Sequence, residues 1–99
     1  MNFLNNLSDI PIEEILSSKG RTKIIKILAL DGETNITNIV EKTKLNHTSV
    51  ISHLDILVDL GLVQEKKYGR IRIFRYKSEF LRANALKKFI EFWENPNLE

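Results

Sequence analysis

The sequence contains no cysteine, and this absence excludes several kinds of site at once. Without a thiol, the chain forms no disulfide, gives no thiolate ligand to a metal ion and has no cysteine nucleophile. Its only histidines, His47 and His53, fall on different faces of the helix expected there. No nucleophile–base arrangement or phosphate-binding glycine loop is recognisable. We therefore expect no metal site, no cofactor and no enzymatic activity.

Long hydrophobic runs are also missing. No apolar stretch approaches the roughly 20 residues that cross a bilayer, and the N-terminus, residues 1–6, lacks the basic start of a signal peptide. These absences predict a cytoplasmic protein with no membrane partner.

The 99 residues have room for a single domain with one core. Hydrophobic residues make up 42% and charged residues 28%, a composition typical of folded globular proteins.

Acidic residues are absent from one strongly basic stretch near the middle of the chain. The formal net charge of +2 says little by itself, but the segment from 66 to 77 holds six basic residues, namely Lys66, Lys67, Arg70, Arg72, Arg75 and Lys77. Clustering of one sign of charge indicates an anionic partner. A basic hairpin that is merely solvated is the alternative explanation of the cluster taken alone.

The residues from Lys44 to Val63 predict a capped helix that turns directly into a strand. Asn46 suits the N-cap, where its side-chain oxygen can accept from an N–H of the first turn. Gly61 suits the position just past the helix, where a left-handed backbone costs glycine nothing. Apolar residues recur at helical spacing and predict a buried stripe of Val50, Leu54, Leu57 and Leu60. Small polar residues at the helix start fit a helix that reads the major groove.

The remaining pattern predicts a mainly α fold with a small β-hairpin. Helices are expected over residues 11–17, 19–30, with Ser18 as N-cap, and 37–44, with a short extended link at 34–36. Strands are expected over 62–67 and 70–76, joined by a turn at Tyr68-Gly69. Ser78 is expected to cap a last helix that runs to about residue 94. The whole chain, 1–99, is expected to form one domain: an extension (1–17), a core (18–77) and a C-terminal helix (78–95).

This order of elements is that of a winged helix-turn-helix domain. Residues 18–28, the helix at 45–54, Gly61-Leu62-Val63 and the Gly69-Arg70 hairpin tip resemble ArsR-type winged-helix regulators, especially archaeal ones, over about residues 18–77. The resemblance implies a transcriptional regulator that binds double-stranded DNA. Metal-sensing members of that family use clusters of cysteine or histidine, which this chain lacks, so metal sensing is not implied.

Two groups of side chains are the candidate DNA contacts. At the start of the reading helix, hydroxyl groups help to position DNA but discriminate bases less sharply than Arg or Asn would; the candidates there are Asn46, His47, Thr48, Ser49 and Ser52. In the wing, an arginine at the tip suits the minor groove and the other cations suit phosphates; the candidates are Lys66, Lys67, Tyr68, Arg70 and Arg72.

Asp55 and Asp59 oppose this interpretation, since they follow Thr48 and Ser52 along the same line of the helix. A carboxylate 4 Å from a phosphate is repelled by about 1 kcal/mol even in bulk water. The difficulty disappears if the helix has left the groove at that point, or if arginines of the domain pair with these carboxylates. His53 falls on the inner side of the helix and is expected to be a hydrogen-bonded packing residue.

The C-terminal helix is apolar over about half of its circumference, wider than the ~100° stripe of an ordinary surface helix. We expect the excess to face a second subunit, in an interface of Phe3, Leu7, Leu86, Phe89, Ile90 and Trp93. A monomer whose N-terminal segment folds back over this helix is the alternative. Two rival functions stay open: a sequence-tolerant, chromatin-type DNA binder and a winged-helix module that binds another protein.

Overall fold

A computed structural model describes residues 10–95 of the chain. The elements are α2 (Ile12–Ile15), α3 (Lys19–Asp31), β1 (Glu33–Asn35), α4 (Ile36–Thr43), α5 (His47–Asp59), β2 (Val63–Tyr68), β3 (Ile71–Tyr76) and α6 (Leu81–Glu94). This confirms the predicted mainly α fold with a hairpin and a C-terminal helix. Phe3 and Leu7, which were expected at a dimer interface, lie outside the described residues.

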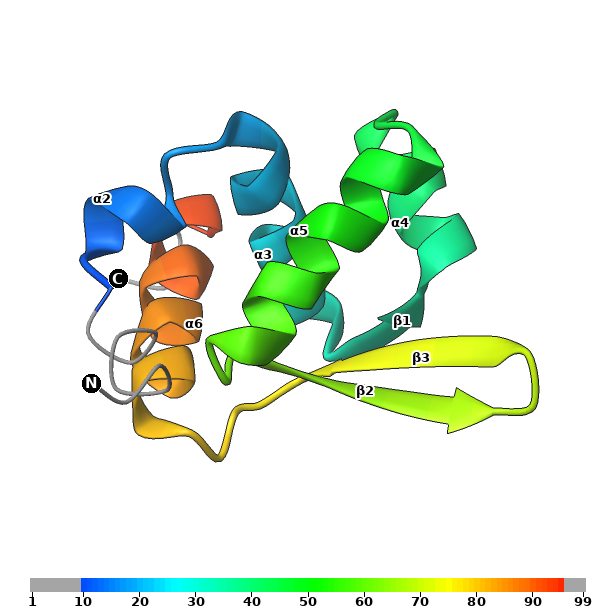
Figure 1. Ribbon diagram of the computed structural model, residues 1–99. Helices are drawn as coiled ribbons and strands as arrows, with labels where there is room; N and C mark the ends of the chain where they lie inside the picture. The colour runs from blue at the N-terminus through cyan, green and yellow to red at the C-terminus, as the bar shows by residue number, and fades with distance from the viewer. Residues whose placement is uncertain (1–9, 96–99) are drawn as a thin grey trace, which may run out of the picture.

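Besides the predicted hairpin, the sheet contains a short strand at the place where the sequence predicts a short extended link. β1 pairs antiparallel with β3, with Glu33 opposite Arg75, and β2 pairs with the other edge of β3, so that the strand order is β1-β3-β2. The expected extended link is therefore a short strand, and Ile36 already belongs to α4. The three strands form a small antiparallel sheet beneath α5 (Figure 1).

Side-chain caps begin three of the helices, as the sequence pattern indicates. The Ser18 hydroxyl accepts from the backbone N–H of Arg21 at 3.1 Å, and the Asn46 side chain accepts from that of Ser49 at 2.8 Å. Asn35 caps α4 in the same way. Gly61 follows α5 with φ +80°. The predicted cap at Asn46 and glycine stop at Gly61 are thus confirmed.

Two local predictions are wrong. Ser78 does not cap α6, which starts at Leu81 with Phe80 in the N-cap position and no side-chain cap. The reason is an intervening turn, in which the Phe80 N–H donates to the Lys77 carbonyl at 2.9 Å and delays the helix. Tyr68 does not belong to the hairpin turn: it pairs with Ile71 at the end of the ladder, so the turn consists of Gly69, at φ +61°, and Arg70.

The hydrophobic core surrounds α3, which contacts α4, α5, α6 and the sheet. The predicted stripe of α5 is largely buried, with Val50, Leu54 and Leu57 fully covered and Leu60 half-buried. Phe74 of β3 is fully buried beside them. The opposite face of α5 therefore stays free to present polar side chains.

Tyr76 fixes α6 to the sheet. Its hydroxyl donates to the carbonyl oxygen of Ala83 at 2.6 Å, and Ala83 is itself fully buried. Burial raises the pKa of the Tyr76 phenol to about 12.

Within the described residues, no helix is long and apolar enough to pass through a membrane.

Candidate nucleic-acid interface

The first turns of α5 present the polar side chains that the sequence singled out. Asn46, His47, Thr48 and Ser52 are exposed, whereas Ser49 is half-buried. The side-chain oxygen of Asn46 is occupied by its capping bond, so its free amide group is the part that remains available. The start of α5 is thus an accessible polar surface built on a rigidly capped helix.

Lys44 is a further candidate that sequence reasoning missed. It lies in the turn between α4 and α5, is exposed, and adopts a left-handed backbone conformation with φ +62°. The buried Thr43 hydroxyl shapes this turn, donating to the Ile39 carbonyl at 2.7 Å and accepting from the Leu45 N–H at 3.2 Å. A lysine directly before the reading helix was the available signal. The turn therefore places an exposed lysine two residues before Asn46, the N-cap of α5.

The wing extends away from the helices and ends in exposed residues. Tyr68 is 62% exposed and Ile71, its partner in the ladder, 60%. Arg70 is exposed in the turn, and within residues 10–95 no ion pair holds it. The wing tip and the N-terminal end of α5 lie on the same side of the molecule, with α2 and α6 on the opposite side (Figure 1).

Much of the basic stretch is neutralised by carboxylates from elsewhere in the chain. Lys66 pairs with Glu33 at 2.9 Å, and Arg75 pairs with Glu79 at 2.7 Å. The hydrogen bond from Arg75 lowers the pKa of Glu79 to about 2. Lys67 is 69% exposed and lies 4.0 Å from Glu65. The wing is therefore less basic than its own sequence indicates, and Arg70 and Lys67 carry most of its available charge.

Arg72 is half-buried and bound to carboxylates of its own chain. Its Nε donates to Glu65 Oε2 at 2.6 Å and its Nη2 to Glu65 Oε1 at 3.2 Å. Nη2 also lies 3.9 Å from Oδ1 of Asp55. The expectation that arginines of the domain pair with the acidic residues of α5 is therefore confirmed for Asp55. Asp59 forms no ion pair with any described residue.

His53 packs against the start of α3, as expected, but the predicted hydrogen bond is wrong, because its side chain forms none with the described residues. A Cβ placed on Gly20 would lie 3.3 Å from His53 Nε2, which shows how closely the two helices approach. His53 Nδ1 is buried and has no hydrogen-bond partner among the described residues. Burial, and secondly the charge of Arg21, lower the pKa of His53.

The structure divides the expected face of α6 into two parts. Leu86 and Ile90 are half-buried and pack on the core of the same chain. Phe89 and Trp93 are 59% and 73% exposed, and their rings stack with centroids 6.0 Å apart. Phe92 is 58% exposed. Only the outer part of this face is thus available to another molecule.

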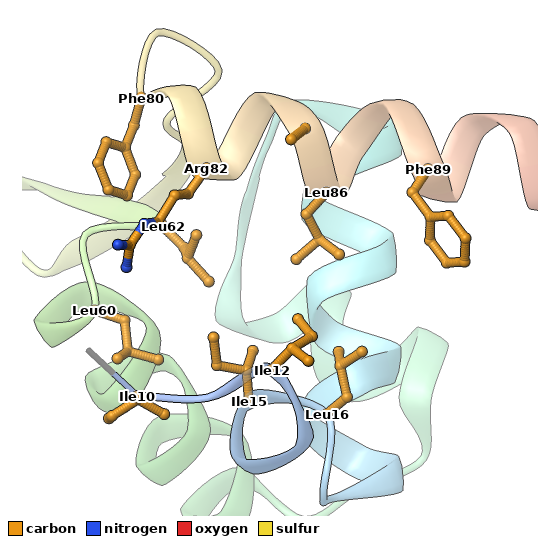
Figure 2. A pocket seen from close by; sticks show the side chains of 11 residues that line it. Ile10, Ile12, Ile15, Leu16, Leu60, Leu62, Phe80, Arg82, Leu86 and Phe89 are labelled. Carbon is orange, nitrogen blue, oxygen red and sulfur yellow. The ribbon is translucent and has the colours of Figure 1, made fainter. Parts of the chain in front are cut away.

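An apolar groove of about 770 Å³ adjoins Phe89. Its walls are side chains of α2, the end of α5 and α6, which face one another across the space (Figure 2). Ile12, Ile15 and Leu16 form one wall, with Leu86 and Phe89 opposite. The accessible apolar surface of the described chain is therefore concentrated on the side away from the wing tip.

In residues 10–95, no three His, Cys, Asp or Glu side chains gather as a metal site would require.

The capped helix α5 after a short helix and turn, followed by the β2–β3 hairpin of a three-stranded sheet, defines a winged helix-turn-helix fold. Residues 18–65 match the family model described as bacterial regulatory protein, arsR family. This segment, just under half of the chain, is therefore similar to regulatory proteins of the arsR family. No curated protein sequence is a significant match to the chain.

Solved structures have the same fold. The chain is similar to HlyU from Vibrio cholerae, with 19% identity and a TM-score of 0.72, over 92% of this chain and 95% of that one. It is also similar to a homodimeric winged helix-turn-helix DNA-binding domain from Mycobacterium bovis, a possible ArsR-family regulator, with 23% identity and a TM-score of 0.69, over 97% and 82% of the two chains. At these identities the likeness shows the fold alone.

Proposed function

We propose that this protein is a sequence-specific transcriptional regulator that binds double-stranded DNA as a homodimer. The observation that carries the proposal is the exposed polar start of α5 on the same side of the molecule as the exposed Arg70 of the wing tip. A recognition helix presents its N-terminal residues to base edges. The match of residues 18–65 to the family model of bacterial regulatory proteins of the arsR family supports this function.

The candidate contacts have different tasks. Thr48 and Ser52, with His47, read base edges in the major groove, where hydroxyl groups can donate or accept. Arg70 enters the adjacent minor groove, whose negative potential attracts arginine. Lys44 and Lys67 bind phosphates, which supplies affinity and salt dependence but carries no sequence information.

The dimer is formed by the outer face of α6. Phe89 and Trp93 expose a stacked aromatic pair, and large exposed apolar patches mark interaction sites. The Mycobacterium bovis domain, which shares the fold, is described as homodimeric. Two-fold symmetry presents two reading helices to successive major grooves, about 34 Å apart, on a nearly palindromic site.

Selection from a genomic fragment library at 50 and 200 mM salt tests the function. A sequence-specific regulator loses most fragments at the higher salt, because the phosphate contribution weakens, and retains a few preferred ones. A sequence-tolerant, chromatin-type binder loses all fragments alike. Absence of binding at 50 mM would exclude both DNA functions and leave a protein-interaction module as the surviving alternative.

A further inference from the structure

Arg72 is enclosed on several sides by groups of its own chain. Glu65 receives two hydrogen bonds from it, at 2.6 and 3.2 Å, and Asp55 approaches to 3.9 Å. The guanidinium also lies 5.4 Å from the centre of the Phe74 ring, which is fully buried. The exposed fractions of the Arg72 and Glu65 side chains are only 29% and 18%. The paired groups are thus partly screened from water.

The contacts join three elements of the reading apparatus. Arg72 belongs to β3, Glu65 to β2 and Asp55 to α5. Arg72 and Phe74 are two residues apart on one strand and therefore share a face of the sheet. A planar guanidinium bound at two points by a carboxylate has a fixed orientation as well as a favourable energy. Because Arg72 lies one ladder pair from the wing tip and Glu65 halfway along the hairpin, the cluster connects the outer half of the wing to the recognition helix.

The charges of the cluster are unsuited to binding a phosphate. Two carboxylates, those of Glu65 and Asp55, surround one guanidinium, so the three groups together carry a net negative charge. Hydrogen bonding to Arg72 lowers the pKa of Glu65, which shows that the pair stabilises the ionised carboxylate. A phosphate that recruited Arg72 would have to displace a bidentate partner already in place.

We propose that Arg72 is a positioning residue, which with Glu65 and Asp55 sets the angle between the wing and the recognition helix, and does not contact DNA. The inference rests on the proposed DNA-binding function, since it assigns a role within that site. The fixed angle allows the wing tip and the start of α5 to reach the same duplex together. Without it, DNA binding must first order the wing, which costs affinity.

Glu65→Gln separates this proposal from simple electrostatics. The substitution removes one negative charge near the interface and frees Arg72, so charge alone predicts tighter DNA binding. The positioning role predicts weaker binding, by a factor on the order of tenfold. Asp59→Asn is the matched control, because it also removes one negative charge, from α5, but leaves the Arg72 cluster intact. This variant should bind DNA at least as tightly as the parent protein. Tighter binding by Glu65→Gln would overturn the proposal.

Arg72→Lys provides a second test, because lysine keeps the charge but loses the two-point geometry. Positioning predicts that Arg72→Lys and Arg72→Gln lose affinity equally, and that the slope of log K against log salt stays that of the parent. For Lys67→Gln, a phosphate contact, the slope should become shallower by about 0.9. Parental affinity in Arg72→Lys, with a shallower slope in Arg72→Gln, would identify Arg72 as a phosphate contact and overturn the proposal.

Residual dipolar couplings of the DNA-free protein keep this test independent of the proposed function. Couplings of α5 and of the hairpin report their relative orientation directly. In Glu65→Gln and Arg72→Lys the hairpin couplings should no longer fit the parental orientation, while those within α5 still do. Unchanged couplings in both variants would contradict the positioning role. Failure of the parent to bind DNA would overturn the proposed function and leave this measurement to decide the role of Arg72.

Discussion

At the scale of single residues, the interface depends on few freely available cations. Lys66, Arg72 and Arg75 are all paired with carboxylates of the same chain. The more exposed pairs, those of Lys66 and Arg75, contribute little to stability, typically about 0–1 kcal/mol, but all three pairs reduce the charge that the wing can offer to DNA. Arg70, exposed at the tip, therefore has a larger expected share of the binding than its place among six basic residues implies.

Arg70→Ala should weaken DNA binding at every sequence. The wing loses its tip cation, and the slope of log K against log salt should become shallower by about 0.9, the value for one phosphate. Lys88→Ala is the charge-matched control, since Lys88 lies on α6 at the other side of the molecule. Equal affinities of Arg70→Ala and the parent at all salt concentrations would remove the wing tip from the interface.

His53 should make the stability of the fold depend on pH. Its pKa is lowered from 6.5 in the folded protein, so the unfolded chain binds the proton more readily. The stabilisation is complete above pH 6.5 and is lost as pH falls from there through the folded pKa. Urea unfolding at pH 7.5 and in steps below 6.5 should show this decline, and His53→Gln should reduce it. An identical pH dependence in His53→Gln would refute this source of the effect.

At the scale of elements, α5 depends on its cap. Asn46→Ala removes the acceptor for the Ser49 N–H and should lower the free energy of unfolding by about 1 kcal/mol. Asn46→Ser keeps a capping oxygen and should stay close to the parent. Chemical denaturation measures both variants. Equal stability of Asn46→Ala and Asn46→Ser would show that the cap does not stabilise the helix.

The attachment of α6 to the sheet depends on Tyr76. Tyr76→Phe removes the hydroxyl that donates to Ala83 and should lower the free energy of unfolding by about 1 kcal/mol, the net value of a typical hydrogen bond. Tyr68→Phe is the matched control, because Tyr68 is 62% exposed at the wing tip. Its effect should stay within about 0.5 kcal/mol. Thermal unfolding that ranks the two variants the other way would contradict this assignment.

Local signals in the sequence predicted the elements well. Asn46 and Gly61 marked the ends of α5 because caps and glycine stops depend on neighbouring residues alone. The Ser78 cap was predicted wrongly because the turn after β3 is anchored by a tertiary contact, the hydrogen bond from the Lys77 N–H to the Leu62 carbonyl. The charge of the candidate site was also predicted incompletely, because it depends on partners that are distant in the sequence. Glu33 neutralises Lys66 across 33 positions through the pairing of β1 with β3, and no local pattern reveals such a partner.

At the scale of the whole molecule, the described chain has two accessible sides with different chemistry. The start of α5 and the wing tip present polar and cationic groups on one side. α2 and α6 present an apolar groove and the Phe89–Trp93 pair on the other. This separation supports the proposed function, in which one surface joins two subunits while the other binds DNA.

Phe89→Asp or Trp93→Asp should convert the proposed dimer to monomers. Each places a carboxylate in an apolar interface, where an unpaired charge is costly. Sedimentation equilibrium measures the mass, and Lys88→Asp, an exposed position on the same helix, is the control that should stay dimeric. A dimer mass that persists in both aromatic variants would exclude this face of α6 as the interface.

Hydroxyl-radical footprinting of the parent protein on a fragment selected at 200 mM salt tests the central claim most directly. Two reading helices on one dimer should protect two half-sites related by two-fold symmetry, with centres about one helical turn apart, near 10 base pairs, or a multiple of it. Even, weak protection along the whole fragment would contradict sequence-specific binding, and a single protected half-site would contradict the dimer.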